Sequence, residues 1–461
     1  MSELLSVGLD VGTTTTQLIV SRLKAENQAT GFAVPRMEIT NRQVIYRSPV
    51  RFTPLLDEAH VDGAALRKIV EAEYRAAGLH REDVDTGAII ITGETSRKEN
   101  ARVVLDALSE FAGEFVVATA GPHLESVLAA KGAGAVEWSE KTGKTVLHMD
   151  IGGGTSNLAL IREGRIERTG CLNVGGRLIK LEETGRISYV SPVLKGLCKL
   201  TTGEMPTAEA LEILAGLLAR ALEMAAGLRP ADSLLEALTT QETGEPWLPP
   251  EETVVLSFSG GVADCIENRH PSGIFGDMGP ELGQAIRESL LCRGEYMLGA
   301  ETIRATVIGA GCHSAQLSGS TVFYQNVSLP VKNLPVAVFN RQEQDSETLP
   351  ELIRRRIAER DAPKVVLCFP GYGAASYSQI TALADRIATA AGESGIYIAL
   401  EADMAKALGH ALQLRLKKDT PCLCIDRVQL QEESFLDVGE PLGPCLPVVV
   451  KTLVLSKKET V

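Results

Sequence analysis

The sequence lacks a long apolar run and is short of positive charge. No apolar stretch of 18 residues is free of charged side chains, so no transmembrane helix is expected. The 46 Lys and Arg residues are outnumbered by 59 Asp and Glu residues, which gives a net charge of −13. Because an acidic chain is repelled by phosphate backbones and by anionic lipids, neither nucleic acid nor a membrane is an expected partner.

Cysteine and histidine are present without the spacings that bind metals or form redox pairs. The nine cysteines are scattered, and the closest two, Cys422 and Cys424, form a C-x-C rather than a C-x-x-C pair. Residues 1–10 lack a basic segment and already include Asp10, so a secretory signal peptide is not expected. These features predict reduced thiols in the cytoplasm. The seven histidines show no H-x₃₋₅-H spacing, and no protein-built metal site is predicted.

Several common nucleotide and hydrolase motifs are also missing. Residues 143–145 read Gly-Lys-Thr like the end of a P-loop, but Trp138 stands where the first glycine would be needed. Residues 152–157 place Asn157 where a dinucleotide fingerprint needs its last glycine, and a strand follows where a helix should. No G-x-S-x-G or H-E-x-x-H motif occurs.

What is present is a glycine-rich hairpin pattern at residues 146–160. An apolar strand ends at Asp150, residues 152–154 are all glycine, Thr155 follows, and a second apolar strand begins. A glycine turn lets several backbone N–H groups converge on one point, which suits a phosphate, because a Cβ would block both the turn and the ligand. Asp150 would face the same point and could hold a hydrated Mg²⁺.

A similar pattern occurs near the N-terminus. Counted from Asp10 and from Asp150, the residues Asp, Gly, Thr and Leu coincide at the first, third, sixth and ninth places. Two such hairpins favour a duplicated fold with two phosphate-binding loops on one nucleotide, although two ordinary hairpins with turn-capping aspartates remain an alternative. The candidate nucleotide-binding residues are Gly12, Thr13, Thr14, Thr15, Gly152, Gly153, Gly154 and Thr155, and the candidate Mg²⁺-binding residues, acting through water, are Asp10 and Asp150.

Other segments repeat in the same order in each half. A strand followed by glycine occurs at residues 88–93 and again at 254–261, and a small-residue segment occurs at 127–135 and again at 306–313. Their glycines, at positions 132, 134, 309 and 311, would allow close helix crossing and a hinge, with simple close packing as the plainer interpretation. The sequence therefore predicts an internal duplication with different insertions.

Two candidate roles attach to the strand–glycine segments. The turn of Ser259, Gly260 and Gly261 would let an adenosine approach the backbone, unless it is only a tight turn. Glu94, directly after the first segment, is a candidate catalytic residue that orients the attacking water, with a solvated surface glutamate as the alternative.

The fold class predicted is α/β, with three units. In the last unit, strands alternate with helices, and Gly371 to Gly373 are interpreted as a strand-to-helix turn. The predicted units are residues 1–140, with a peripheral insertion at about 24–85; residues 141–338, with a helical insertion at about 178–250; and a C-terminal α/β module at 339–461.

The motifs also resemble a known superfamily. Residues 7–14, 149–155 and 256–261 look like the first phosphate, second phosphate and adenosine motifs of the actin, Hsp70 and sugar kinase superfamily. As an ordered set these motifs are specific, and they cover about residues 4–320. The resemblance implies duplicated actin-like (ribonuclease H-like) ATPase domains with a nucleotide cleft between them, which bind ATP and Mg²⁺.

Longer strings are similar to the family of ethanolamine ammonia-lyase reactivating factors. They lie at residues 88–94, 116–127, 171–178, 304–311, 317–320 and 334–337. The resemblance implies an ATP-dependent chaperone that binds the inactivated, adenosylcobalamin-dependent lyase and lets damaged cobalamin exchange for intact cofactor. Related diol dehydratase reactivases carry a small subunit that nothing in this chain resembles.

Other functions remain open on the same fold. A small-molecule kinase would need a carboxylate base beside an acceptor hydroxyl, and a non-catalytic actin-like scaffold would need neither. A homodimer and an association with a bacterial microcompartment are also left open by the resemblance, although residues 1–10 show no encapsulation tag.

Overall fold

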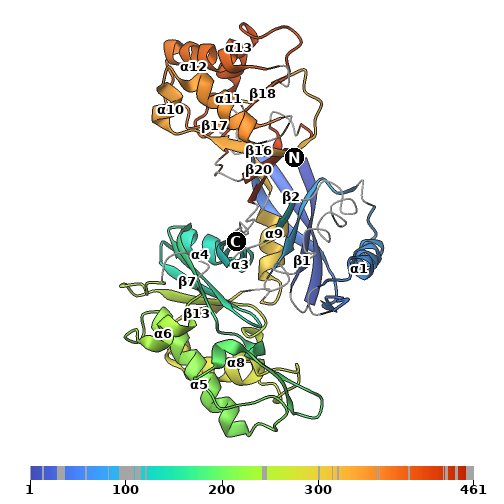
Figure 1. Ribbon diagram of the computed structural model, residues 1–461, viewed down its shortest axis with the longest axis vertical. Helices are drawn as coiled ribbons and strands as arrows, with labels where there is room; N and C mark the ends of the chain where they lie inside the picture. Colours follow the sequence, from blue (N-terminus) through green and yellow to red (C-terminus); the bar gives the residue numbers. More distant parts are fainter. Residues whose placement is uncertain are drawn as a thin grey trace, which may run out of the picture.

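In the computed structural model, the described residues form three large β-sheets, which follow one another along the chain, and one two-stranded sheet (Figure 1). The structure describes residues 2–12, 15–27, 37–57, 60–80, 83–92, 108, 116–119, 122–240, 247–299, 302–313, 315–318, 321–360, 362, 364–392, 395–428, 430, 434–441 and 445–452. Within these residues no helix combines the length and the apolar character that crossing a bilayer requires.

The first sheet has the strand order β3-β2-β1-β5-β6, with the short β4 beside β2. Strands β1, β2 and β3 are antiparallel, whereas β5 and β6 run parallel to β1. The bounds are β1 Ser2–Val11, β2 Thr15–Asn27, β3 Met37–Arg47, β4 Arg51–Phe52, β5 Thr86–Ile91 and β6 Val116–Thr119.

The second sheet repeats this order as β9-β8-β7-β12-β13, with the same strand directions. The bounds are β7 Val146–Ile151, β8 Ser156–Arg162, β9 Arg165–Leu172, β12 Val255–Ser259 and β13 Tyr296–Leu298. The register also repeats, because Asp10 lies opposite Gln17 in the first hairpin and Asp150 lies opposite Asn157 in the second. The predicted duplication and the α/β fold class are therefore confirmed.

Two helices of these units begin at residues whose side chains cap them. The side chain of Asp62 accepts a hydrogen bond from Ala65 N at the start of α1, and Thr207 accepts one from Ala210 N at the start of α5. The bounds are α1 Gly63–Ala76, α3 Pro122–Gly132, α4 Ala135–Thr142, α5 Ala208–Ala225, α6 Ser233–Leu238, α7 Asp264–Glu267, α8 Gly279–Glu288 and α9 Ala305–His313. Strands β10 Ile179–Leu181 and β11 Ile187–Val190 form a separate small hairpin.

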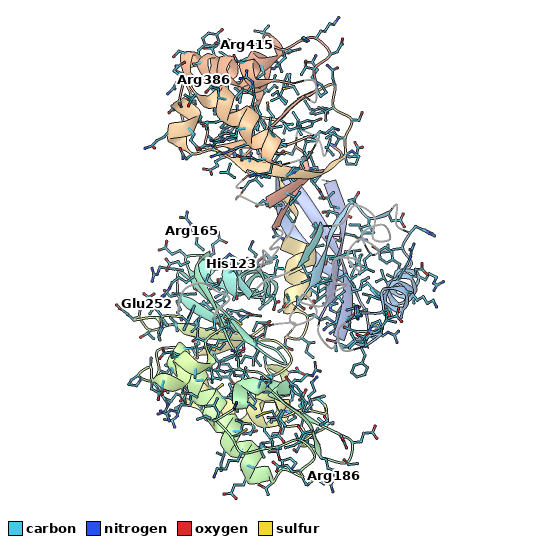
Figure 2. The ribbon with its side chains drawn as sticks, in the orientation of Figure 1. His123, Arg165, Arg186, Glu252, Arg386 and Arg415 are labelled. Carbon is cyan, nitrogen blue, oxygen red and sulfur yellow. The ribbon has the colours of Figure 1, made fainter. Side chains whose placement is uncertain are left out.

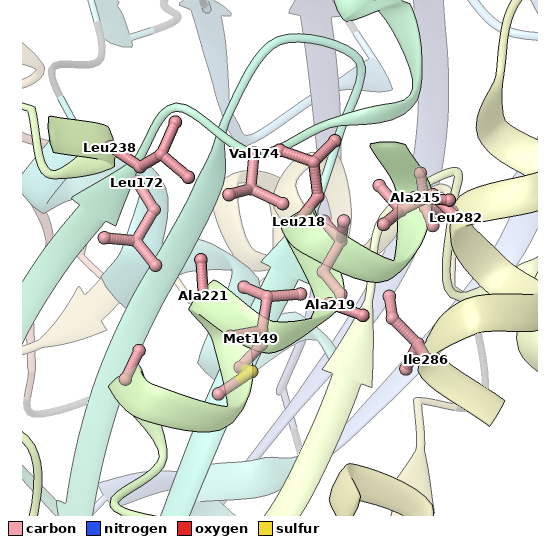
Figure 3. Packing of buried hydrophobic residues seen from close by; sticks show 14 of the residues in the cluster. Met149, Leu172, Val174, Ala215, Leu218, Ala219, Ala221, Leu238, Leu282 and Ile286 are labelled. Atoms are coloured by element: carbon pink, nitrogen blue, oxygen red, sulfur yellow. The ribbon is translucent and has the colours of Figure 1, made fainter. Parts of the chain in front are cut away.

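The largest core cluster lies between the second sheet and helices α5 and α8. Met149 and Leu172 from the sheet face Leu218 of α5, and Ile286 of α8 packs on the same cluster (Figure 3). Because all four side chains are almost fully buried, this packing fixes one face of β7. The opposite face of β7, which carries His148 and Asp150, is thereby turned away from α5 and α8.

Helices α3 and α9 each pack on the sheet of the other unit. Helix α3 follows the first sheet but packs against β7, β8 and β9 of the second, whereas α9 follows the second sheet but packs against β1, β2 and β5 of the first. At the start of α3, His123 (Figure 2) shares a hydrogen bond of 2.7 Å between its Nδ1 and Thr169 Oγ1 of β9. The two helices therefore join the two units.

The crossing of α3 and α9 depends on glycine. A Cβ at Gly132 would lie 1.8 Å from Ala305 O, and a Cβ at Gly309 would lie 2.0 Å from Leu128 O. A Cβ at Gly311 would lie 3.0 Å from Gly8 N of β1. The close packing predicted for these glycines is confirmed, whereas Gly134 has open space around it and occupies the left-handed region at φ +78°.

The third sheet has the order β14-β21-β20-β16-β17-β18-β19-β15. Strands β16 to β19 are parallel and carry helices α10 to α13 between them, as an α/β module requires. The bounds are β14 Ala315–Leu317, β15 Phe323–Gln325, β16 Val331–Val338, α10 Arg341–Asp345, α11 Leu349–Glu359, β17 Val366–Phe369, α12 Tyr377–Ala390, β18 Ile396–Leu400, α13 Ala405–Gln413, β19 Cys422–Asp426, β20 Ser434–Val438 and β21 Pro447–Thr452.

Two features of this unit bear on the sequence predictions. Gly371, at φ +66°, lies between β17 and α12, so the predicted strand-to-helix turn is confirmed. Strands β14, β15 and β16 place residues 315–317, 323–325 and 331–338 in the third sheet, although the sequence assigned these residues to the second unit. The reason is non-local pairing, since β14 pairs with β21 and β16 with β20, and no local pattern shows this.

Candidate functional site

The first candidate phosphate loop connects β1 to β2. Gly12 N donates a hydrogen bond of 2.9 Å to Thr15 O, which closes the turn. A Cβ at Gly12 would lie only 3.0 Å from Thr15 O, so glycine is favoured here. Thr13 and Thr14, the remaining predicted residues of this loop, lie outside the described residues.

The second candidate loop, between β7 and β8, is closed in the same way. Gly152 N donates to Thr155 O at 2.9 Å, equal to the distance in the first loop. Gly153 lies against the side chain of Arg177, and Gly154 has nothing within 4 Å of an added Cβ. The loop therefore has an open side at Gly154, where a ligand could approach the backbone.

The structure brings the two predicted aspartates together. Asp10 is the next-to-last residue of β1, and Thr92 Oγ1 donates to its Oδ1 at 2.8 Å. Loss of hydration raises the pKa of Asp10 to about 7; the hydrogen bond from Thr92 lowers this pKa, and the nearby negative charges of Glu125 and Asp150 raise it. These charge effects indicate that the carboxylates of Glu125 and Asp150 lie near that of Asp10.

Asp150 has a more extensive set of partners. Ser259 Oγ donates to Asp150 Oδ1 at 2.5 Å, and Thr306 Oγ1 lies 3.5 Å from Asp150 Oδ2. Burial raises the pKa of Asp150 to about 6, against the lowering effect of these two hydroxyls. Thr306 is in α9, so the helix that crosses between the sheets also reaches this aspartate.

Behind Ser259 lies a fully buried histidine. His148 Nε2 is 3.0 Å from Ser259 Oγ, and His148 Nδ1 is 3.0 Å from Ser257 Oγ. Because Ser259 gives its only proton to Asp150, it must accept from His148, which assigns the proton of the neutral ring to Nε2. Burial lowers the pKa of His148 to about 3, so the ring stays neutral.

Glu125 of α3 joins the site from the crossing helix. Asn157, opposite Asp150 in the hairpin, donates from Nδ2 to Glu125 Oε2 at 2.9 Å. The buried Oδ1 of Asn157 and the buried Oε1 of Gln17, its counterpart in the first hairpin, have no hydrogen-bond partner among the described residues. Such orphaned acceptors suit hydrated cations or ordered water, which can supply the missing donors.

The predicted adenosine turn follows β12. Gly260 has φ +89°, and an added Cβ would lie 2.3 Å from Ile151 O, so only glycine fits. Gly261 has nothing within 4 Å of an added Cβ. The Ser259 side chain points to Asp150, so it belongs to the carboxylate network, whereas the glycines remain the candidate adenosine contact.

Sequence reasoning missed part of this constellation. Thr92, Glu125 and His148 were not proposed, because each joins the site through strand register or helix crossing. Glu125 could have been proposed as a site residue, because it lies in a segment of small residues for which a close helix crossing was predicted. Glu94, the predicted catalytic residue, lies outside the described residues.

The described side chains do not by themselves form a metal cage. Over the part of the chain that the structure describes, no group of three or more His, Cys, Asp and Glu residues has the geometry to hold a metal ion. The carboxylates of Asp10 and Asp150 are nevertheless placed where their charges interact.

Comparison with known proteins identifies relatives of this chain. Two curated proteins named ethanolamine ammonia-lyase reactivase EutA are similar along their length. The one from Salmonella typhimurium is 40% identical, and the one from Escherichia coli is 39% identical, each over 98% of both chains.

Solved structures resemble it more distantly. A Ppx/GppA family member from Aquifex aeolicus has a TM-score of 0.37 at 15% identity, covering 57% of this chain and 69% of that one. The ethanolamine utilization protein EutJ from Carboxydothermus hydrogenoformans has a TM-score of 0.34 at 18% identity, covering 66% of this chain and 88% of that one. These scores are too low to carry an argument, so the fold rests on the repeated strand order.

A family model settles the relationship. The model of the ethanolamine utilisation protein EutA matches residues 2–456, which is nearly the whole chain. The chain belongs to the family of the ethanolamine utilisation protein EutA.

Proposed function

We propose that this protein is an ATP-dependent reactivating chaperone for adenosylcobalamin-dependent ethanolamine ammonia-lyase. It would bind the lyase blocked by damaged cobalamin, release that cofactor and let intact adenosylcobalamin bind. Family membership and two relatives named reactivases support the client. The convergence of Asp10 and Asp150 between two matching glycine loops is the observation that carries the ATP dependence.

ATP would bind with its phosphates between the two loops. The amides of Gly12–Thr15 and Gly152–Thr155 would contact the β- and γ-phosphates, and the turn at Gly260 and Gly261 would contact the adenosine. The open backbone at Gly154 and Gly261 supports this placement, because a Cβ-free surface permits close approach.

Mg²⁺ would be held through water by Asp10 and Asp150. Burial raises the pKa values of both carboxylates, so a divalent cation bound beside them would stabilise their ionised forms. The orphaned oxygens of Gln17 and Asn157 would accept hydrogen bonds from water bound to the ion. When bound, the ion supplies positive charge that neutralises the phosphates during transfer.

Glu125 is our candidate to position the attacking water. Its carboxylate lies close enough to Asp10 to raise the pKa of that group, and Asn157 fixes its orientation. Because Glu125 is on α3, which packs across to the second sheet, its position depends on how the two units are arranged. Glu94 stays an alternative from the sequence.

The two units would then form a nucleotide-dependent switch. Helices α3 and α9 each contact the other unit's sheet, and Thr306 of α9 lies near Asp150. A ligand that touches both loops binds one arrangement of the units better than another and shifts the population by that difference. The lyase would bind one of the two arrangements more tightly, and hydrolysis would reset the cycle.

The decisive experiment is reactivation of cyanocobalamin-blocked lyase. The inactive complex is incubated with this protein, ATP, Mg²⁺ and fresh adenosylcobalamin, and ammonia release is followed. Activity should return only in the complete mixture, and released cyanocobalamin should appear in the filtrate. No return of activity under any condition would refute the proposal, and a stoichiometric phosphorylated small-molecule product would favour a kinase.

Two finer parts belong to the same proposal. We place the protein in the cytoplasm in association with a bacterial microcompartment, and we propose a homodimer as its working form. Light scattering of the purified protein tests the dimer. Co-sedimentation with shells purified from ethanolamine-grown cells tests the association.

A further inference from the structure

One segment of the first unit exposes apolar side chains that its own fold does not use. In residues 50–56, the exposed fractions are 45% for Val50, 79% for Phe52, 45% for Leu55 and 68% for Leu56. Single exposed apolar residues are common, but several that neighbour one another in a short segment are typical of an interaction site.

The segment is held in a defined shape. The Leu56 amide donates to His60 O at 3.0 Å, Leu55 bridges to Val61, and Asp62 N donates to Pro54 O at 2.9 Å. These backbone contacts lead directly into the N-cap of α1. The apolar side chains are therefore presented on an ordered surface, which lowers the entropy lost on binding.

Beside Phe52 lies a groove between β4 and α1. It is lined by Arg51, Phe52, Lys68, Ile69, Ala72 and Glu73. The buried carboxylate of Glu73 is neutralised from within the chain, since Arg51 and Tyr46 both donate to it. Lys68 has no ion-pair partner among the described residues, so the groove presents a net positive charge on a protein that is acidic overall.

The segment is joined to the first phosphate loop. Thr53 is buried, and its Oγ1 donates to Gly12 O at 2.8 Å. Thr53 Oγ1 also lies 3.0 Å from the hydroxyl of Thr16, while Phe52 pairs with Thr15 in the sheet. If phosphate binding moved the loop, the movement would therefore be passed to Phe52 directly, through Thr53 and through the pairing with Thr15.

The chain just before this segment contacts the second unit. Ser48, just before it, binds Leu18 through backbone and side chain, and its carbonyl accepts from Arg304 Nη2 at 3.2 Å. Arg304 directly precedes α9, and Thr306 in that helix lies near Asp150. The first phosphate loop thus contacts the segment directly through Thr53, and the second unit contacts Ser48, two residues before Val50.

We propose that the surface formed by Val50, Phe52, Leu55, Leu56 and the adjoining groove docks ethanolamine ammonia-lyase, and that nucleotide controls this docking. The inference rests on the function proposed above. The groove fits an apolar side chain of the lyase flanked by a carboxylate, because apolar walls and the unpaired Lys68 offer those two contacts. Client binding and nucleotide binding are then coupled through Thr53 and Ser48.

The test measures binding of cyanocobalamin-blocked lyase to immobilised full-length protein with ADP or a non-hydrolysable ATP analogue. Wild type should show affinities that differ between the two nucleotides, by a factor in the range of about 5–150 typical of such coupling. Phe52→Ser and Leu56→Ser should each weaken binding about ten-fold or more and lose reactivation, yet keep the basal ATPase rate. Lys68→Glu should weaken binding as well.

Matched controls separate docking from general surface effects. Tyr377→Ser and Leu414→Ser remove side chains that are 81% and 83% exposed on the third unit, and both should bind the lyase normally. Lys406→Glu on α13 is the control for charge. Thr53→Val should keep binding without nucleotide but lose the difference between ADP and the ATP analogue.

The outcomes are distinct. If wild type reactivates the lyase and Phe52→Ser and Leu56→Ser do so equally well, the docking surface is wrong while the proposed function stands. If wild type neither binds nor reactivates the lyase, both fall. If Phe52→Ser abolishes self-association in light scattering but leaves lyase binding intact, the surface joins two copies of this chain, and the proposal is overturned.

Discussion

The two halves of the candidate nucleotide site share a backbone but differ in how their aspartates are held. Among the described residues, Asp10 accepts one side-chain hydrogen bond, from Thr92, and Gly8 in the same strand lets α9 approach so closely that an added Cβ would lie 2.5 Å from Val307 O. Asp150 accepts from Ser259 and lies 3.5 Å from the Thr306 hydroxyl, and His148 occupies the place in β7 that corresponds to Gly8 in β1. One half uses the position for helix packing, and the other uses it for a buried hydrogen-bond chain.

The difference shows what a duplicated fold preserves. Strand order, hairpin register and the amide bond that closes each loop are repeated, because they determine where phosphate meets backbone. The polar partners have diverged, because several arrangements can orient a carboxylate. Both halves should therefore be essential for ATP hydrolysis, but substitutions in the two halves should have different effects.

The strongest test removes each aspartate in turn. Asp10→Asn and Asp150→Asn keep the shape of the side chain but remove the charge that would hold hydrated Mg²⁺. We expect each to lower kcat for ATP hydrolysis by about 10²–10³-fold, while circular dichroism and melting show an intact fold. Normal turnover in both variants would show that neither carboxylate serves the metal, and loss in only one would break the symmetry of the two loops.

The helix crossing offers a comparison of the two units' contributions to stability. Gly132→Ala and Gly309→Ala would each place a Cβ about 2 Å from a backbone atom of the other helix, so the backbones must separate. We expect each to lower the free energy of unfolding by about 2–3 kcal/mol, measured by urea denaturation. Gly134→Ala is the matched control, because it has open space and only its positive φ is strained, which costs about 1 kcal/mol.

Equal losses at Gly132 and Gly309 would mean that α3 and α9 support the crossing alike. A loss at Gly134 as large as that at Gly309 would contradict the close-contact explanation, because it would show that any substitution near the crossing is harmful.

The buried histidine makes the second half distinctive. His148→Leu leaves Ser259 without its donor, so the serine hydroxyl can turn away from Asp150. We expect the Mg²⁺ concentration for half-maximal ATPase activity to rise by about ten-fold, equivalent to roughly 1.4 kcal/mol, with a smaller change in kcat. His148→Gln, which can donate from a similar position, should restore most of the affinity.

A spectroscopic measurement checks the same assignment. Nitrogen chemical shifts of His148 should show the neutral Nε2–H tautomer from pH 5 to 9, because burial holds the pKa near 3. A protonated ring in this range would show that the histidine acts as a charge near Asp150. A purely structural role would lower stability in both His148 variants without changing the Mg²⁺ requirement.

The extent to which sequence predicts this molecule follows from the range of each interaction. The two loops depend on residues a few positions apart, and the crossing glycines stand in two matching small-residue segments, so both patterns are visible in the chain. The network around Asp150 depends on β7 pairing in parallel with β12, which sets His148 beside Ser257 more than one hundred residues away. No local pattern encodes that register.

The same limit explains what was placed differently in the third unit. Strands β14 and β16 look like continuations of the second unit in sequence, but their partners β21 and β20 lie near the end of the chain. The sequence of a short apolar strand does not determine which sheet, or which neighbouring strand, it will pair with. The duplication itself was predictable, since it repeats spacing as well as residue type.

The smallest expected effect is on the pH dependence of stability, which should be larger for Asp10 than for Asp150. The pKa of Asp10 is raised to about 7 and that of Asp150 to about 6, above the ordinary value of 3.8. An acid that binds its proton more tightly when folded destabilises the fold as pH rises from about 4 to its folded pKa. In metal-free protein, Asp10→Asn should therefore melt a few degrees higher than wild type at pH 8, Asp150→Asn should gain less, and both gains should vanish near pH 4. Differential scanning calorimetry at pH 4, 6 and 8 measures this, and a gain that is independent of pH, or larger for Asp150→Asn, would contradict the environments described for the two carboxylates.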